Sequence, residues 1–515
     1  MKKFYILIIT GITIIINCAQ AQTNVSGGIY SNTSWTQANS PYIVTDTVVV
    51  FPGVTLTIQP GVTVKFNNGM RIELRQSGLI AIGTLTDSIS FTSNSPSPTV
   101  GIWNSIYLNG ENMSSKFNYC TFQYANYGIN LSPTLYSSIS DSLIIKNCNF
   151  NFNNWGVYFI GYEGMTWSYT GIAFIDSCNF KNNLNYGMIL TELVSATINN
   201  CYFSNNGTGL QSGGNHSQIN NCIFNSNQTG LIPTYTAANN CSFKYNQTGI
   251  KSSSENRIKN CTIDSNSVLG ISANGDSVVN CYIRYNGEGI QTAVSVILGN
   301  IIEHNTGDNI QDESFNLNGF AIISGNTIRY GSIGIVDNLG AFTITKNIIE
   351  NNTLGITLNN KNSTITCNRI CNNTTYDIKY TSNGNINATH NFWCTPDSAS
   401  TRAVIYDGYD NINYGLINFM PIDSTCSPAT AVNEIISNDL INIYPNPTKG
   451  VFNVQMSKFE NAQMEIYNVL GERINRQIIK SQNQQIDLSA TPDGVYFMKI
   501  KNEQGVATKK IILSH

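Results

Sequence analysis

The sequence predicts an all-β protein in which a parallel β-helix is followed by a small immunoglobulin-like β-sandwich. Two observations predict this fold. A unit of about 20 residues, with short alternating strands and no helical period, recurs through most of the chain, which is typical of a solenoid. Near residue 437 the pattern changes to short strands spaced 8 to 15 residues apart, and 16 of the 59 Lys, Arg, Asp and Glu residues lie in the last 79 positions.

The N-terminus predicts a cleavable signal peptide over residues 1–21. Two lysines precede an apolar stretch from Phe4 to Ile16, and Ala19 and Ala21 form the small-residue pattern of a cleavage site. No later apolar run is long enough to cross a bilayer. We therefore expect export through the Sec pathway and a mature protein without a transmembrane segment.

The composition argues against several classes of partner. Charged residues make up 11% of the chain and the net charge is −3, so no basic face is available for nucleic acid or an anionic membrane. No set of side chains shows the acidic ligand pattern of a metal site. We expect a monomer that needs neither a cofactor nor a metal.

One position of the repeat, here called the lead column, holds first Cys and then Asn, and the Cys spacing settles to 19 to 23 residues. Its members are Cys120, Cys148, Cys178, Cys201, Cys222, Cys241, Cys261, Cys281, Asn300, Asn326, Asn347, Asn368 and Asn391. Two residues after each member stands an apolar side chain, from Phe122 to Trp393. This alternation of period two predicts a short strand whose lead-column side chains point inward.

A second column of asparagines follows five residues after the lead column. Its members are Asn153, Asn183, Asn206, Asn227, Asn246, Asn266, Asn286, Asn305, Asn352 and Asn373. Gly-Ile or Gly-Leu follows in most units, as in Gly249-Ile250. Asn and Gly tolerate left-handed turns, so we expect turns here. Such a repeat buries its apolar side only by coiling and stacking, and the stacked amides can then form a hydrogen-bond ladder.

The segment from Tyr42 to about Ala125, the Asn-x-Ile and Gly-Ile repeats, and the ending Asn391-Phe392-Trp393 resemble right-handed β-helix repeat proteins of the pectate-lyase-like superfamily. The resemblance covers roughly residues 25–425 and implies a right-handed parallel β-helix, which we assign to residues 22–427. It says little about activity, because this architecture hosts lyases, hydrolases, adhesins and inert spacers.

Residues 428–436 are predicted to form a linker and residues 437–515 a separate domain. The motif residues of this domain are Pro445, Asn446, Pro447, Gly450, Gly471, Gly494, Lys509 and Lys510. In this order they resemble the type A C-terminal sorting domain of the type IX secretion system. The resemblance implies the type IX machinery as a partner, and a protein that is either held at the outer-membrane surface or released.

The cysteines are interpreted mainly as buried free thiols. Side chains stacked one turn apart hold their Cβ atoms near 4.8 Å, slightly too far for a relaxed disulfide, and small buried hydrophobes suit the positions. Cys371 and Cys394 differ, because each lies three residues after the lead column in successive units. We expect them on the outer face as a disulfide. The sequence leaves the state of Cys367 and Cys426 open.

Two further columns suggest a functional face. Three residues after the lead column stand Lys244, Asp264, Arg284, Glu303, Arg329 and Glu350, whose signs alternate, which predicts an exposed ladder of ion pairs. The next position holds Tyr245, Tyr285, His304 and Tyr330, with Ser265 between the first two. Because sugar rings stack on aromatic faces, we predict glycan binding or adhesion through Tyr245, Tyr285 and Tyr330.

Two alternatives remain open at this point. The first is a polysaccharide lyase or glycoside hydrolase, with Glu303, His304, Asp308, Arg284 and Arg329, together with Asp312, as candidates for acid and base groups. The second is a passive structural spacer, in which the charged column only fixes the register of the turns. The enzyme requires acids that converge on one groove, whereas the binder requires an open aromatic stripe.

Overall fold

The structure is a computed structural model that divides into two compact units, residues 1–428 and 429–515. It describes residues 22–109, 115–132, 142–160, 171–191, 194–213, 217–252, 254–313, 320–395, 397–423, 425, 441–456, 462–468, 473–479, 483–502 and 505–514. The predicted signal peptide and linker lie outside these residues.

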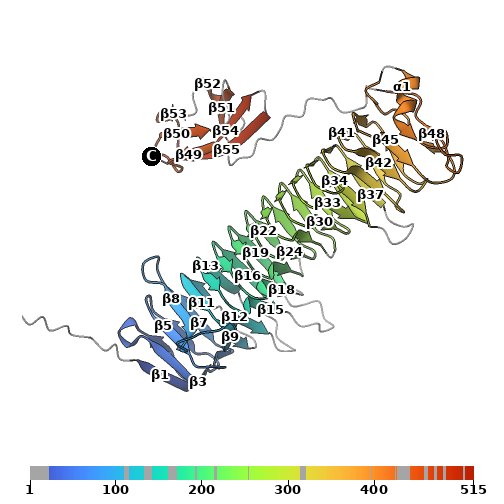
Figure 1. The fold of residues 1–515 in the computed structure, drawn as a ribbon. Helices are drawn as coiled ribbons and strands as arrows, with labels where there is room; N and C mark the ends of the chain where they lie inside the picture. Colours follow the sequence, from blue (N-terminus) through green and yellow to red (C-terminus); the bar gives the residue numbers. More distant parts are fainter. Residues whose placement is uncertain are drawn as a thin grey trace, which may run out of the picture. The chain divides into compact units, whose positions relative to one another are not determined.

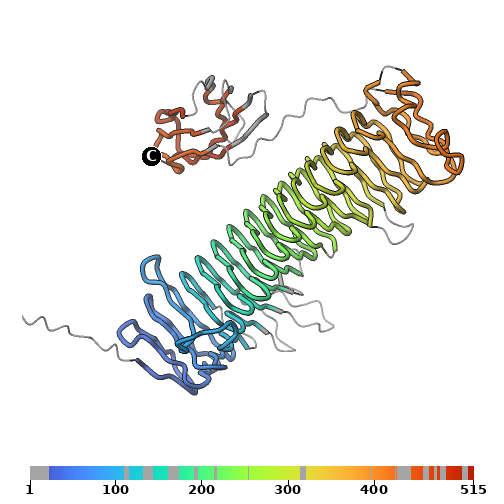
Figure 2. The backbone as a smooth tube through the Cα atoms, in the orientation of Figure 1, coloured from blue at the N-terminus to red at the C-terminus, as the bar shows by residue number. Residues whose placement is uncertain are grey.

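The first unit is a parallel β-helix, as predicted (Figures 1 and 2). A representative turn contains β26 (Ser242–Lys244), β27 (Thr248–Lys251) and β28 (Arg257–Lys259). Strands of the first two kinds join a 31-stranded sheet, and strands of the third kind join a 15-stranded sheet. Each strand pairs in parallel with the equivalent strands one turn away, so that β26 lies in register with β29 (Thr262–Asp264).

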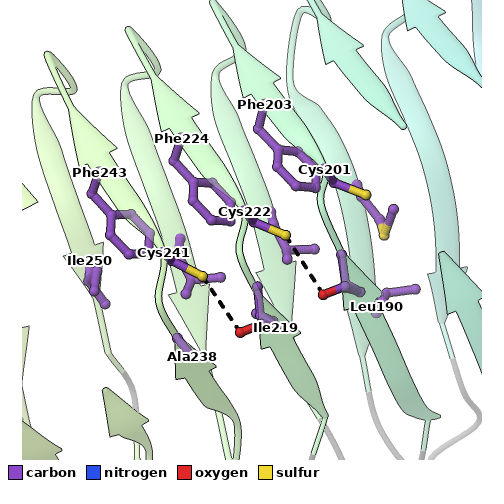
Figure 3. Close-up of a cluster of buried hydrophobic side chains, with 14 of the residues drawn as sticks. Leu190, Cys201, Phe203, Ile219, Cys222, Phe224, Ala238, Cys241, Phe243 and Ile250 are labelled. Atoms are coloured by element: carbon purple, nitrogen blue, oxygen red, sulfur yellow. Dashed lines mark hydrogen bonds between the residues drawn. The ribbon is translucent and has the colours of Figure 1, made fainter. Parts of the chain in front are cut away.

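The interior of the β-helix is built from stacked identical side chains. Seven rings, Phe91, Phe122, Phe150, Phe180, Phe203, Phe224 and Phe243, stack with centroids 4.7–4.8 Å apart. The eight lead-column cysteines, Cys120 to Cys281, are buried and free, which confirms the predicted thiol column. Figure 3 shows Cys222 and Cys241, whose thiols donate to backbone carbonyls at 3.6–3.7 Å. These weak bonds satisfy the sulfur atoms without any disulfide.

The asparagines five residues after the lead column form a buried amide ladder. In each step the side-chain Nδ2 of one Asn donates to Oδ1 of the Asn in the next turn, for example Asn227 to Asn246 at 3.0 Å. The backbone N–H of Asn227 donates to the same oxygen at 2.8 Å, and its Nδ2 also donates to the carbonyl of Phe203. A second ladder runs from Asn300 to Asn391 in the lead column.

The first ladder is continued where its own asparagine is missing. Gly331 occupies the ladder position of its turn and contributes no side chain. Asn309 replaces the missing amide, because it accepts from Asn305 Nδ2 at 2.8 Å and donates to Asn352 Oδ1 at 3.0 Å. At the last turn Asp377 accepts from Asn373 Nδ2 at 2.8 Å and so ends the ladder. Both substitutes stand where most turns have the Gly of the Gly-Ile pair.

The turns are placed differently from the sequence prediction. The ladder asparagines do not have positive φ; the residue before each does, as do the residues that precede the lead column, such as Asn240 (φ 54°). The Gly of the Gly-Ile pair is required by space and not by φ. A Cβ on Gly230 would lie 2.5 Å from the carbonyl oxygen of Gly249 and 3.2 Å from the ring of Phe243.

The C-terminal end of the β-helix carries the short helix α1 (Ser398–Ala403) and β47 (Ile405–Tyr406), which pairs with β45 (Tyr376–Tyr380). Cys371 and Cys394 form a disulfide with their Cα atoms 5.6 Å apart. Cys371 continues the charged column, because it pairs in register with Glu350, and it is nevertheless fully buried. Cys367 is also disulfide-bonded, and Cys426 lies outside the described residues.

The second unit contains two antiparallel sheets, as expected for a small β-domain. One sheet contains β49 (Ile441–Tyr444), β50 (Val451–Met456) and β53 (Asn483–Asp487); the other contains β51 (Ala462–Asn468), β52 (Arg473–Ile479), β54 (Gly494–Asn502) and β55 (Gly505–Leu513). Phe452 and Ile486 of the first sheet share one buried cluster with Ile466 and Met498 of the second.

Candidate functional site

The charged column lies in register, one residue per turn, on the strands that include β29, β32 (Tyr282–Arg284), β35 (Ile301–Glu303) and β38 (Thr327–Arg329). In this column Arg284 and Arg329 each pair with the acid of the preceding turn. Arg284 Nε lies 2.9 Å from Asp264 Oδ2, and Arg329 Nε lies 2.7 Å from Glu303 Oε2. The expectation of an exposed ladder is wrong for Asp264 and Glu303, which are buried, whereas Glu350 is partly exposed.

Glu303 is held by both of its carboxylate oxygens. Oε2 accepts from Arg329, and Oε1 accepts from the hydroxyl of Tyr282 at 2.6 Å. Burial, together with the neighbouring Glu303 carboxylate, raises the pKa of Tyr282. Sequence analysis missed Tyr282, although its position one residue after Cys281 places it on the same outward face as Arg284. Only 4% of the surface of Glu303 is exposed, and each of its oxygens already accepts one hydrogen bond.

The aromatic column beside these ion pairs forms a stacked stripe. The ring of His304 lies between Tyr285 and Tyr330, with centroid separations of 5.2 and 4.6 Å and interplanar angles near 15°. Tyr285 and Tyr330 are 52% and 43% exposed. Arg284 and Arg329 place their guanidinium groups 5.5 and 5.3 Å from the Tyr285 and Tyr330 ring centroids. An open aromatic surface edged by two cations results.

Tyr245 stands apart from this stripe. It is 64% exposed, but Ser265 occupies the turn between it and Tyr285. The residues of this column, Tyr245 included, have φ between 55° and 58°, a left-handed conformation that costs a bulky residue energy. Other turns place Asn at this position, as in Asn205 and Asn351, so the aromatic residues are not needed to make the turn.

The two remaining candidate acids do not join Glu303. Asp312 belongs to β36 (Ile310–Asp312), where the alternation of the strand directs it inward. It is buried, and its Oδ2 accepts from the backbone N–H groups of Asn338, Leu339 and Gly340 at 2.8–3.1 Å. Grouping Asp312 with Glu303 was therefore wrong. Asp308 is partly exposed and accepts from the backbone of Ile333, and burial raises its pKa.

Within the described residues, no group of three or more His, Cys, Asp or Glu side chains is placed to hold a metal ion. The same part of the chain contains no helix that is both long and apolar enough to span a membrane. Because its rings are stacked on one another, the stripe can offer ring edges and tyrosine hydroxyls to a ligand, and its arginines can donate hydrogen bonds.

Most of the described motif residues of the second unit lie on or beside its last strand, whereas Gly450 packs against Ser489. Asn446 Nδ2 donates to the carbonyl of Lys510, and its Oδ1 accepts from the N–H of Ile512, both at 2.8 Å. Gly450 has a φ of +120°, and a Cβ there would lie 2.7 Å from Cα of Ser489. Pro445 and Pro447 flank Asn446, Gly494 begins β54, and Lys509 lies on β55. Gly471 lies outside the described residues.

Two family models match the chain. Residues 163–306 match the right handed beta helix region, and residues 442–514 match the secretion system C-terminal sorting domain. The first match agrees with the β-helix described above, and the second covers the antiparallel unit. Comparison with curated proteins gives no match.

Several solved structures are similar to the chain at low identity. A periplasmic alginate epimerase is 12% identical, over 58% of this chain and 74% of its own, with a TM-score of 0.34. The A-module of an Azotobacter vinelandii mannuronan C-5 epimerase is 12% identical over 70% and 89%, with a TM-score of 0.25. A tailspike protein of the E. coli bacteriophage HK620 is 8% identical over 91% and 86%, also with a TM-score of 0.25. These likenesses do not indicate what this chain binds.

Proposed function

We propose that this right-handed parallel β-helix protein, which ends in a secretion system C-terminal sorting domain, passes through the Sec and type IX pathways. It then acts outside the cell. The N-terminal signal pattern supports the first step. The sorting domain supports the second step and a location at the outer-membrane surface or in the medium.

At that location we assign the β-helix a role as a glycan-binding or adhesive rod. The observation that carries this proposal is the stack of Tyr285, His304 and Tyr330. Because the three rings stack face to face one turn apart, they present a row of ring edges and tyrosine hydroxyls about 10 Å long, against which a sugar chain can pack. Arg284 and Arg329 beside the rings can donate hydrogen bonds to sugar hydroxyls.

The contacts of Glu303 favour binding over catalysis. A general acid or base must reach the substrate with an oxygen, and both oxygens of Glu303 are engaged by Tyr282 and Arg329. A lyase or hydrolase centred on Glu303 would release product from a polysaccharide, and Glu303→Gln would abolish that release while sparing binding. Product formation by the wild type that is lost in Glu303→Gln would replace the binding proposal with an enzymatic one.

Replacing Tyr285 and Tyr330 by Asn tests the stripe. Asn is the best non-aromatic choice because Asn351 already adopts the same left-handed φ one turn beyond Tyr330. The double variant is expected to lower the affinity for polysaccharide at least tenfold, while the melting temperature stays equal or rises slightly. Affinity electrophoresis in polysaccharide gels and thermal unfolding measure the two quantities.

Tyr235→Asn is the matched control. Tyr235 is 43% exposed and has a φ of 49°, so it resembles Tyr330 in exposure and conformation but lies outside the stripe. Its variant should retain full binding. Equal loss in the control and the double variant would refute the stripe as the binding site, and wild-type protein that neither binds nor cleaves any polysaccharide would leave only the passive spacer.

The sorting role predicts a separable export defect. Deleting residues 437–515 should leave a folded β-helix in the periplasm, because the two units have separate hydrophobic cores. Asn446→Ala should give a milder version of the same defect, since it removes both hydrogen bonds that tie the Pro-Asn-Pro segment to β55. Cell fractionation checks both variants, and normal surface levels of the deletion variant would refute the export route.

A further inference from the structure

A second aromatic surface lies on strands near the N-terminal end of the β-helix. Its strands are β9 (Trp103–Asn109), β12 (Ala125–Ser132) and β15 (Trp155–Ile160). Tyr127 and Trp155 pair in register and stack at 4.8 Å, and Tyr158 lies 4.8 Å from Tyr127 and 6.1 Å from Trp155. All three rings are partly exposed. Tyr158 alternates with the buried Val157 and Phe159, and the rings of Tyr127 and Trp155 contact its ring, so all three lie on the outer face.

A charged cluster continues this surface toward the N-terminus. One outward residue per turn pairs in register across this surface, beginning with Glu73 of β6 (Ile72–Arg75) and continuing through Tyr107 and Asn130 to Tyr158. Glu73 is buried and accepts from Arg71 Nη2 and Arg75 Nε, both at 2.6 Å.

These contacts leave an excess of positive charge. Burial alone would raise the pKa of Glu73, but hydrogen bonds from Arg75, Asn109 and Arg71 together hold this pKa below its ordinary value. Two cations thus face one carboxylate, and β9, β12 and β15 bring no other charged residue. The Arg71 guanidinium also lies 5.3 Å from the Tyr107 ring centroid. Each arginine has five N–H donors, and one donor of each makes a hydrogen bond to Glu73.

We propose that this face, comprising Arg71, Arg75, Tyr107, Tyr127, Trp155 and Tyr158, is a binding site for an acidic polysaccharide. Sugar rings stack on the tyrosines and Trp155, and a carboxylate of the same chain pairs with the arginines in the fork geometry that guanidinium groups favour. From Glu73 to Tyr158 is three turns, about 14 Å, so the cations and the rings can contact neighbouring sugars of one strand. The site does not depend on the Tyr285 stripe.

Tryptophan fluorescence reports on this face directly. Trp35, Trp103 and Trp393 are buried, whereas Trp155 is partly exposed. In a Trp167→Phe background, which removes the tryptophan outside the described residues, titration with polygalacturonate should change the Trp155 emission and protect it from acrylamide. Neutral dextran should bind at least tenfold more weakly. Dextran sulfate distinguishes recognition of carboxylates from recognition of any anionic polysaccharide; binding of both anionic polymers still supports the site.

Tyr158→Ala and Arg75→Gln should each weaken the polygalacturonate titration about tenfold, and Arg75→Gln should also reduce its salt dependence. Tyr409→Ala, at an exposed tyrosine in the C-terminal cap, should change nothing. Thermal unfolding shows whether each variant is folded. If Tyr158→Ala does not fold, Arg75→Gln alone serves as the test.

Equal binding of dextran, or equal binding of a single-stranded oligonucleotide, would overturn the assignment to an acidic polysaccharide. If the Trp155 signal follows Tyr285→Asn and ignores both Tyr158→Ala and Arg75→Gln, this second site fails while the proposed function stands. If no polysaccharide binds in any assay, both fail together.

Discussion

Replacing Asn309 with Gly is expected to lower the free energy of unfolding by about 3 kcal/mol, and adding Gly331→Asn is expected to restore most of that loss. Asn309→Gly alone removes the acceptor of Asn305 Nδ2 and the side-chain donor to Asn352 Oδ1, which then accepts only from the backbone N–H of Gly331. Each lost partner costs about 1–3 kcal/mol. The double variant rebuilds the arrangement of the regular turns, with Gly in the Gly-Ile position and Asn in the ladder.

Gly331→Asn alone completes the cycle. Its Cβ would lie 2.5 Å from Nδ2 of Asn309, so the single variant is overpacked and should lose about 1–3 kcal/mol. Urea unfolding of all four proteins gives the coupling energy. Additive losses, with the double variant less stable than either single variant, would show that Asn309 does not stand in for the missing ladder residue.

Asp377→Asn is expected to stabilise the protein at pH 8 by up to about 4 kcal/mol relative to its effect at pH 4. Asp377 is buried at the end of the ladder, and burial raises its pKa to about 7, against the opposing hydrogen bonds from Asn373. An Asn keeps the acceptor that Asn373 Nδ2 requires and carries no charge, as Asn309 shows at the equivalent position.

The sign follows from the raised pKa. The folded protein binds a proton at Asp377 up to about pH 7, whereas the unfolded chain loses it near the ordinary aspartate pKa of 3.8. The stability of the wild type should therefore fall as pH rises from about 4 to about 7 and stay level above that range. Urea midpoints of variant and wild type across this range measure the difference, and a difference that does not change with pH would contradict the assigned pKa.

The periodicity of the sequence was sufficient to predict the β-helix. Lead-column residues recur because identical side chains stack. Period-two alternation alone predicts that the rings from Phe122 to Phe243 stack and that the thiols from Cys120 to Cys281 are buried. The turn geometry did not follow, because Asn, Ser and Tyr all occupy the left-handed position, so residue identity does not mark it. Asn309 was also missed, since its role depends on an absent side chain in the next turn.

The candidate site was only partly predictable. The columns placed Arg284, Glu303 and Arg329 side by side, but which partner each chooses and how deeply the acids are buried depend on side-chain packing. Asp312 could have been excluded from the sequence, because alternation within Ile310–Asp312 directs it inward. The second aromatic face was missed because Arg71, Arg75 and Tyr107 lie in turns that precede the first lead-column residue, Cys120, and so fall outside the aligned repeat.

The central claim, that the stripe of Tyr285, His304 and Tyr330 contacts a glycan, is tested most directly by residue-resolved hydroxyl-radical footprinting of the mature protein with and without a bound polysaccharide. Exposed rings are oxidised unless a ligand covers them. The account predicts that the polysaccharide protects Tyr285 and Tyr330 severalfold, while Tyr235, which is as exposed as Tyr330, is oxidised equally in both samples. Unchanged oxidation of Tyr285 and Tyr330 under saturating polysaccharide would contradict it.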